Sequence, residues 1–212
     1  MANFYERRIL PGMIDKICAL KPTRKQREKV IPLARGRVLE IGIGSGLNLP
    51  FYNPEEVDLV IGIDPSPEMW ALNTVPLDTL PFAVEFVEGY ARSMPVDAGS
   101  VDSVVVTYTL CTIKEIAASM TEIRRVLKPG GQLIFTEHGL APDRKVRRWQ
   151  NGINPIWKRV TGGCNLNRDI PALLTTHGFV IDQLDTMYIP GWKPACFNFW
   201  GTASVGAEGA MS

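Results

Sequence analysis

The sequence predicts an α/β protein whose strands form a mostly parallel sheet with helices on both faces. Short runs of Val, Ile, Leu and Phe alternate with helical patterns from Arg37 onward, which is typical of βαβ units. Their almost continuous apolar content fits a parallel sheet that is covered on both sides. We expect the strands of this region at residues 38–41, 59–63, 84–87, 101–107 and 132–136.

The clearest helix lies between the fourth and fifth of these strands. Apolar residues recur there every three or four positions from Ile113 to Leu127, and Pro129-Gly130-Gly131 ends the pattern. Two further strands joined by a short turn predict an antiparallel hairpin at one edge of the sheet. The remaining helix, strand, turn and last strand are expected near residues 170–177, 180–187, 190–194 and 197–203.

The composition indicates one domain that binds a small molecule. A chain of 212 residues is long enough to bury a core, and we treat residues 1–212 as a single domain. Lys and Arg number 23 against 22 Asp and Glu, so no bulk charge attracts nucleic acid or an anionic membrane. We therefore expect a small-molecule partner and no nucleic acid, and we make no prediction of oligomeric state.

The cysteines and the apolar runs indicate a cytoplasmic protein. Four cysteines are scattered without a Cys-x-x-Cys pair, which argues against a zinc site and a disulfide-rich scaffold, so we predict no metal. The N-terminus lacks the apolar core of a signal peptide. No apolar run reaches the ~18 residues of a membrane-spanning helix, so we expect no membrane span.

Two segments outside the alternating region are expected to cover it. Residues 1–36 read as an interrupted N-terminal helical cap, and its basic stretch around Arg24, Lys25, Arg27 and Lys29 reads as a solvated helix face. Residues 140–168 are rich in Arg, Trp, Asn and Pro, and they predict a helix plus loop inserted as a substrate lid.

A glycine loop follows the first strand and is the strongest functional signal. Gly42, Gly44 and Gly46 let backbone amides approach a ligand at the carboxyl end of the sheet, where open α/β folds bind cofactors. A dinucleotide fingerprint would place its third glycine at Leu47. Glu40 precedes the loop and would repel a pyrophosphate but attract the ammonium and sulfonium groups of S-adenosylmethionine. The loop therefore favours S-adenosylmethionine.

Asp64 ends the second strand, about 20 residues after the loop begins, where an acid accepts hydrogen bonds from ribose hydroxyls. Alternatively, the glycines only make a tight turn and Asp64 caps the helix that begins at Ser66-Pro67-Glu68. The order strand, acid, three glycines, strand, acid favours the cofactor interpretation.

These motifs resemble those of class I methyltransferases of the type 11 group. The resemblance rests on Val38–Gly46, Gly62–Ser66, Gly99–Asp102 and Arg124–Gly131. It implies a Rossmann-like, seven-stranded sheet with one antiparallel strand, S-adenosylmethionine as cofactor, and adenine contacts around Gly89-Tyr90-Ala91. This sequence has Tyr90 and Arg92 where the family usually has acids. The residues expected to contact the cofactor are Glu40, Gly42, Gly44, Ser45, Gly46, Asn48, Asp64, Pro65, Ser66, Met69, Gly89, Tyr90, Ala91, Thr107 and Leu110.

The acceptor side is expected after the fourth and fifth strands. His138 is our candidate catalytic base, because the unperturbed pKa of histidine suits proton transfer near neutrality, although it could simply hydrogen-bond a loop. His177 reads as a helix-end residue. The residues expected to line the acceptor pocket are Tyr108, Cys111, Trp149 and Asn165, with ordinary helix packing as the alternative for Trp149.

The later segments resemble the methyltransferase-like 7 proteins, a group that includes alkyl thiol S-methyltransferases. Thr109–Ile113, Glu137-His138, Trp149-Gln150, Pro155-x-Trp157 and Gly163–Arg168 carry this resemblance. It implies S-methylation of a thiol, whose free pKa near ~8.5 lies close to neutrality. These relatives carry an N-terminal hydrophobic membrane anchor, which the basic start of this chain does not resemble.

Other functions remain open from the sequence. Related type 11 proteins methylate nitrogen or carbon in lipids, quinones and other metabolites. A nicotinamide-dependent oxidoreductase would need the glycine that Leu47 replaces. A non-catalytic S-adenosylmethionine-binding protein would bind the cofactor without turnover.

Overall fold

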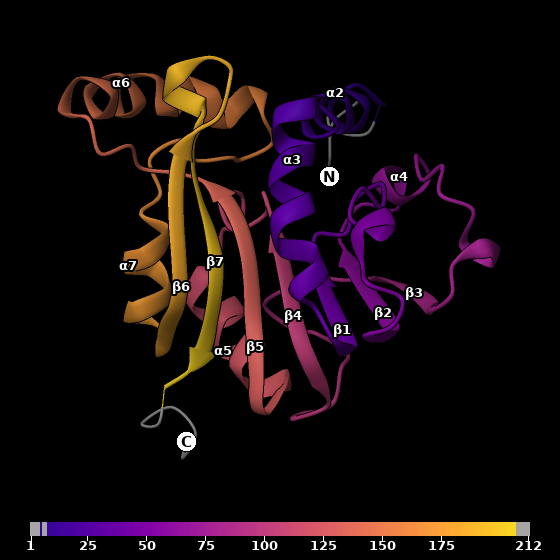
Figure 1. Cartoon of the computed structure of the whole chain (residues 1–212). Coiled ribbons are helices and arrows are strands. Elements are labelled where there is room, and N and C mark those ends of the chain that lie inside the picture. The colour runs from indigo at the N-terminus through magenta and orange to yellow at the C-terminus, as the bar shows by residue number, and fades with distance from the viewer. Residues whose placement is uncertain (1–4, 6–7, 207–212) are drawn as a thin grey trace.

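A seven-stranded sheet forms the centre of the molecule (Figure 1). The computed structural model describes residue 5 and residues 8–206. The strands follow the order β3-β2-β1-β4-β5-β7-β6, and only β7 runs antiparallel to its neighbours. Their bounds are β1 Gly36–Ile41, β2 Val57–Asp64, β3 Ala83–Glu88, β4 Val101–Thr107, β5 Leu127–His138, β6 Phe179–Tyr188 and β7 Phe197–Val205.

The predicted α/β fold and its terminal antiparallel pair are therefore confirmed. Each observed strand overlaps the expected segment, and the largest difference is β5, which begins five residues earlier than residue 132. The sequence predicts that Pro129-Gly130-Gly131 ends the preceding helix. These three residues lie instead near the start of strand β5. The helix itself ends at Val126, where Leu127 takes an extended conformation.

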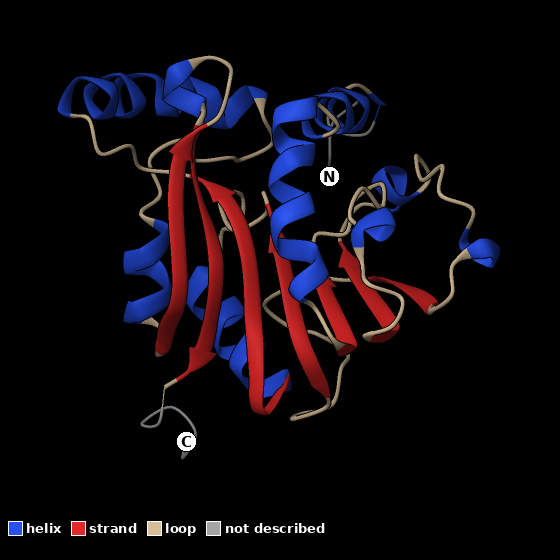
Figure 2. Ribbon diagram, in the orientation of Figure 1, coloured by secondary structure: helices blue, strands red, loops and turns tan. Residues whose placement is uncertain are grey.

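Helices cover both faces of the sheet (Figure 2). Helix α3, Lys21–Val30, crosses one face and contacts β5 and β7. Helices α5, Ile116–Val126, and α7, Ile170–Thr176, lie on the other face. The shorter α2, Leu10–Cys18, and α4, Pro67–Trp70, and the long α6, Arg144–Val160, lie at the carboxyl end of the parallel strands (Figure 1).

Two hydrophobic clusters, one on each face, hold these layers together. Because side chains alternate along a strand, neighbouring residues of β1 enter different clusters. Leu39 packs in the cluster that holds Met120 of α5, whereas Val38 packs in the cluster that holds Val30 of α3. All four are 0–1% exposed, so the sheet is buried on both faces along β1.

The connections after β1 and β2 contain no long helix. The first contains the 3-10 turn Leu49–Phe51, and the second contains the four-residue α4 and the 3-10 turn Leu77–Thr79. These connections therefore leave the carboxyl ends of β1 and β2 open to helices from elsewhere in the chain. Among the described residues, no helix is both long and apolar enough to cross a lipid bilayer.

Gln150 anchors α6 to the rest of the fold. Its side chain is 0% exposed, and Oε1 accepts a hydrogen bond from the Ala141 amide at 3.0 Å. Its Nε2 lies 2.9 Å from the carbonyl oxygens of Gly139, Leu166 and Pro194. One buried amide thus satisfies backbone groups of three separate loops.

We expect Gln150→Leu to lower the free energy of unfolding by about 2–4 kcal/mol, because it leaves several buried backbone groups without partners. Trp149→Leu, at the neighbouring position, is the matched control. The Trp149 side chain is 65% exposed, so its substitution should change the free energy of unfolding by no more than ~0.5 kcal/mol. Urea denaturation of both variants measures the difference. Equal losses would show that Gln150 has no special anchoring role.

Candidate active site

A cavity of about 520 Å³ opens at the carboxyl ends of β1, β2 and β4. This volume lies in the ~300–1,000 Å³ range of small-molecule sites. Most of the residues predicted to contact a cofactor line this cavity. They are Glu40, Gly42, Gly44, Ser45, Asn48, Asp64, Pro65, Ser66, Met69, Gly89, Tyr90, Ala91 and Thr107, and Tyr108 from the predicted acceptor set joins them.

The glycine loop is held open by its backbone conformation and by Asp64. Gly42, Gly44 and Gly46 have φ values of 73°, 54° and 75°, which only glycine adopts readily. The Asp64 carboxylate accepts hydrogen bonds from the Gly44 amide at 3.0 Å and the Ser66 amide at 2.9 Å. Burial raises the pKa of Asp64, and these two amides oppose that rise. The loop from β1 and the end of β2 therefore form one rigid unit.

Glu40 lies at the floor of the cavity as a buried carboxyl group. Its two oxygens accept hydrogen bonds from Asn48 Nδ2 at 2.8 Å and the Tyr52 hydroxyl at 2.6 Å. Burial raises the pKa of Glu40 to about 7, against the lowering effect of these donors and of Arg27. Asn48 Oδ1 is buried with no hydrogen-bond partner among the described residues, so it can accept a ligand donor.

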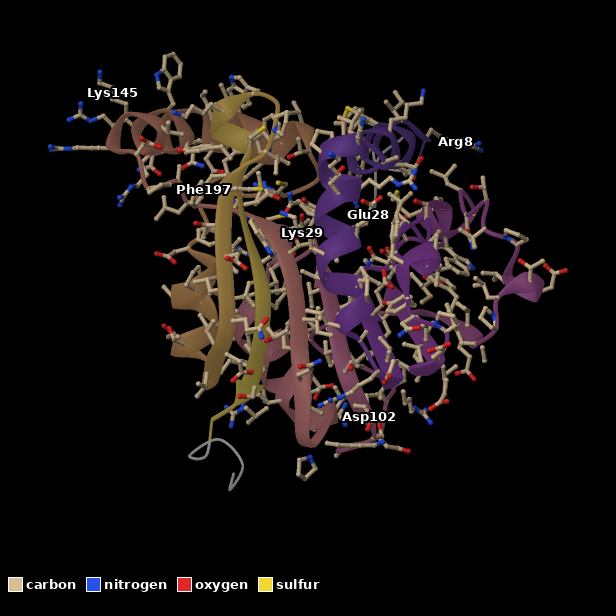
Figure 3. All side chains as sticks on the ribbon, viewed as in Figure 1. Arg8, Glu28, Lys29, Asp102, Lys145 and Phe197 are labelled. Carbon is tan, nitrogen blue, oxygen red and sulfur yellow. The ribbon has the colours of Figure 1, made fainter. Side chains whose placement is uncertain are left out.

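Arg27 also lines the cavity, which corrects the prediction that its basic stretch is a solvated face. Arg24, Lys25 and Lys29 are exposed as predicted, but Arg27 is only 4% exposed. Figure 3 shows Glu28 and Lys29, its neighbours on α3, among the outer side chains. Arg27 precedes the buried Val30 by three residues, and this spacing in the sequence was the signal for its inward face.

The Arg27 guanidinium has donors to spare. Nη1 donates to the Cys18 carbonyl at 2.7 Å, and the group lies 5.3 Å from the centre of the Tyr108 ring. Nε is buried without a hydrogen-bond partner among the described residues. Tyr108 itself has a φ of 52°, a strained value for a residue with a side chain, and its hydroxyl donates to Asn198 at 2.7 Å. A buried cation with free donors indicates a site for an anion.

Other predicted residues lie outside the cavity lining. Trp149 is 65% exposed on the outer side of α6, and Leu110 is 0% exposed in the core. Gly46 shapes the loop but does not line the cavity. Asn165 donates from Nδ2 to the carbonyl oxygens of Cys111 and Gly163, so its side chain supports a loop.

His138, the candidate base, does not line the cavity either. Its Nε2 lies 3.0 Å from Cys164 Sγ, and its Nδ1 has no partner among the described residues. Cys111 is 2% exposed and lies beside the same pair. Sequence reasoning had singled out two of these three side chains but not Cys164, because no local spacing connects them.

The N-terminal cap, rather than the predicted lid, forms most of the cavity's cover. Leu10, Pro11, Ile14 and Cys18 of α2 line it, and Asp15 of the same helix accepts a hydrogen bond from Ser45 in the glycine loop. Of residues 140–168, only Gly162 lines the cavity. The charged side of α6, including Lys145, points into solvent (Figure 3).

This site fits the two ends of S-adenosylmethionine. Its methionyl end carries an ammonium and a carboxylate, for which Glu40 and Arg27 are complementary partners within one cavity. Asp64 keeps further lone pairs for ribose hydroxyls. Tyr90, 53% exposed beneath the Arg92 guanidinium at 4.1 Å, offers an aromatic face to the adenine. The bound cofactor supplies an activated methyl group on a sulfonium.

Comparison with known proteins agrees with this site. Residues 39–135 match the family described as a methyltransferase domain. The YcgJ protein from Bacillus subtilis has the same fold, with a TM-score of 0.64 and 16% identity over 92% of this chain and 97% of that one. A SAM-dependent methyltransferase from Methanosarcina mazei gives a TM-score of 0.61 and 24% identity over 80% and 92%. The fold and site are those of a class I S-adenosylmethionine-dependent methyltransferase, and the cofactor is S-adenosylmethionine.

Curated relatives define the family more closely. Thiol S-methyltransferase TMT1B from Rattus norvegicus is 35% identical over 76% of this chain, and thiol S-methyltransferase TMT1A from Homo sapiens is 35% identical over 81%. The chain spans 65% and 72% of the length of these two relatives. This protein belongs to the same methyltransferase family as TMT1A and TMT1B. A phosphatidylethanolamine N-methyltransferase from Cereibacter sphaeroides matches 49% of the chain, and a demethylmenaquinone methyltransferase from Chlorobaculum tepidum matches 55%.

Arg27→Met should weaken S-adenosylmethionine binding by about ten- to hundred-fold, the value of a charge-assisted hydrogen bond of ~1.5–3 kcal/mol. Binding of 5′-methylthioadenosine, which lacks the amino-acid end, should not change. Arg24→Met on the exposed side of the same helix is the control. Titration calorimetry measures the affinity of the wild type and of both variants for each of the two ligands. Equal weakening for both ligands would contradict a contact between Arg27 and the cofactor carboxylate.

The affinity for S-adenosylmethionine should rise with pH up to about 7 and then level off. Glu40 has a pKa of about 7 instead of 4.5, so its protonated form stabilises the unliganded fold, and that contribution is lost as pH rises through about 7. Binding of S-adenosylmethionine needs the Glu40 carboxylate beside the cofactor's ammonium. Below about pH 7, binding must therefore release the proton from Glu40.

Calorimetry from about pH 5.5 to about pH 8.5, in buffers of different ionisation enthalpy, measures both the affinity and the proton release. Glu40→Gln should bind more weakly and with no pH dependence in this range. A wild-type affinity that stays constant, with no proton release, would place the ammonium elsewhere.

Proposed function

We propose that this protein transfers the methyl group of S-adenosylmethionine to the sulfur of a small apolar thiol. The observation that carries the proposal is the extent of the similarity. The matches to TMT1A and TMT1B cover 76–81% of the chain and reach beyond residues 39–135, whereas the lipid and quinone methyltransferases match 49–59%.

The cover of the cavity supports an apolar acceptor. The lining residues include Leu10, Pro11 and Ile14 from α2 and Ile113 from the loop after β4. An apolar group packed there loses its hydration, which favours binding by about 25 cal/mol per Å² buried. A polar or strongly charged acceptor would gain little from these four residues.

The reaction needs few protein groups beyond this arrangement. Methyl transfer from a sulfonium is an in-line displacement, so holding donor and acceptor in contact supplies much of the rate enhancement. The acceptor must lose its proton, and a thiol with a pKa near ~8.5 is partly ionised close to neutrality. Because His138 contacts Cys164 and not the cavity, the thiolate is drawn from solution in this proposal.

The second candidate is methylation of nitrogen or carbon in a lipid or quinone. The similarity to the phosphatidylethanolamine and demethylmenaquinone methyltransferases supports it. The same apolar cover would accommodate part of such a molecule. An amine or an enolised ring would need a stronger base than a thiol does. Of the carboxylates that line the cavity, we assign Glu40 and Asp64 to the cofactor, and Glu115 pairs with Arg92.

Purified protein should form S-adenosylhomocysteine with apolar thiols and not with amines, phenols or quinols of similar size. Mass spectrometry of both products measures the transfer, and the same thiols already capped as methyl thioethers are the matched negative controls. Across thiols of different pKa, the rate should follow the thiolate fraction. Turnover confined to amines or quinols would favour the second candidate, and binding without any turnover would indicate a non-catalytic protein.

A further inference from the structure

Three potential metal ligands converge beside the cofactor cavity, from segments far apart in the sequence. Cys111 lies in the loop after β4, His138 is the last residue of β5, and Cys164 lies in the loop between α6 and α7. Their Sγ, Nε2 and Sγ atoms all lie within 4.8 Å of one another, and His138 Nε2 is 3.0 Å from Cys164 Sγ. We call these three side chains the Cys-His-Cys cluster.

The backbone around the cluster is fixed by hydrogen bonds that do not involve the three side chains. The Glu137 carboxylate, 0% exposed, accepts hydrogen bonds from the amides of Thr109, Leu110 and Cys111 at 2.6, 2.8 and 3.3 Å. It thereby ties the loop that carries Cys111 to the strand that ends in His138.

Asn165 ties the third segment to the first. Its amide nitrogen and its Nδ2 donate to the Cys111 carbonyl at 2.9 and 2.8 Å. Cys164, the preceding residue, is thereby held beside Cys111. Trp157 Nε1 lies 3.4 Å from Cys164 Sγ and can donate to a thiolate there. The ligands are therefore held in position before any ion arrives, which lowers the entropy cost of binding.

The donor set selects a soft, tetrahedral cation. Two thiolates and one imidazole suit Zn²⁺, whereas Mg²⁺ and Ca²⁺ prefer oxygen ligands. With Zn–S near ~2.3 Å and Zn–N near ~2.0 Å, tetrahedral ligand atoms lie roughly 3.5 Å apart, within the range that the cluster spans. Small side-chain rotations would complete the site.

His138 presents one ring nitrogen to the two sulfurs. Its Nδ1 is buried and has no hydrogen-bond partner among the described residues, so Nε2 provides the polar contact that orients the ring. That nitrogen points at the two sulfurs, as a ligand would. Three protein ligands leave a fourth position for water, the arrangement of zinc sites that are not purely structural.

We propose that Cys111, His138 and Cys164 bind one Zn²⁺ ion, with water as the fourth ligand. Both thiols lose their protons on binding, and the ion undergoes no change of oxidation state. Cys111 Sγ lies 3.5 Å from Thr112 Oγ1, and Thr112 lines the cofactor cavity, so the ion would lie directly behind the wall of the active site. The proposal departs from the expectation of no metal, because Cys-x-x-Cys spacing is not needed when the fold assembles the ligands.

Metal binding is tested without any methyl transfer. Reduced, tag-free protein stripped with a chelator is titrated with Zn²⁺ against a chromophoric competitor, and separately with Co²⁺. We expect one equivalent of Zn²⁺ per chain, and for Co²⁺ a thiolate-to-metal charge-transfer band with intense tetrahedral d–d bands. Fewer than about 0.2 equivalents bound to folded, reduced protein would overturn the proposal.

Variants then assign the ligands. Cys111→Ser, His138→Gln and Cys164→Ser should each weaken Zn²⁺ binding by more than the ~10- to 100-fold that loss of an outer-shell contact costs. Cys196→Ser, another buried thiol outside the cluster, is the matched control and should bind like the wild type. Circular dichroism confirms that each variant is folded. Stoichiometric Zn²⁺ binding that survives Cys164→Ser would place the ion elsewhere and overturn the assignment.

Discussion

Buried carboxylates at the ends of parallel strands are the constraint on which this active site depends. A carboxylate removed from water must be satisfied by donors, and the donors at hand are amides and hydroxyls of the loops that follow. Asp64 at the end of β2 accepts hydrogen bonds from the amides of Gly44 and Ser66, and Glu137 in β5 accepts them from three amides after β4. Glu40 accepts hydrogen bonds from the side chains of Asn48 and Tyr52. The hydrogen bonds that these three buried carboxylates require therefore fix the loops that shape the cavity.

The fold was predictable because its signals are local. Apolar runs, glycines and prolines report on the few residues around them, and they located all seven strands and the antiparallel pair. The glycine loop and Asp64 were equally readable, since a strand, a turn and an acid follow one another along the chain. The bounds of the helices and strands were harder to predict. Pro129-Gly130-Gly131 is typical of a helix end, yet β5 begins before it because Leu127 pairs with Val101 of β4.

The parts of the site that the sequence did not reveal are those assembled by tertiary contacts. Arg27 belongs to a run of basic residues, and its three-residue spacing from Val30 becomes informative once α3 is known to pack on the sheet. Cys164 becomes informative when folding brings it to His138, 26 positions away. Trp149 was expected to line the acceptor pocket, with helix packing as the alternative. It lies on the surface instead, because the next residue, Gln150, turns into the fold.

The cover over the cavity has a thermodynamic consequence. Helix α2 contributes side chains to the cavity and packs against the four-residue α4. Its Asp15 also accepts a hydrogen bond from Ser45 in the glycine loop. A cofactor bound in the cavity would lie against these α2 side chains. Packing of α2 on the fold and binding of the cofactor are then thermodynamically coupled, and each stabilises the other by the same free energy. The methyl donor thus helps to hold α2 in place on the rest of the fold.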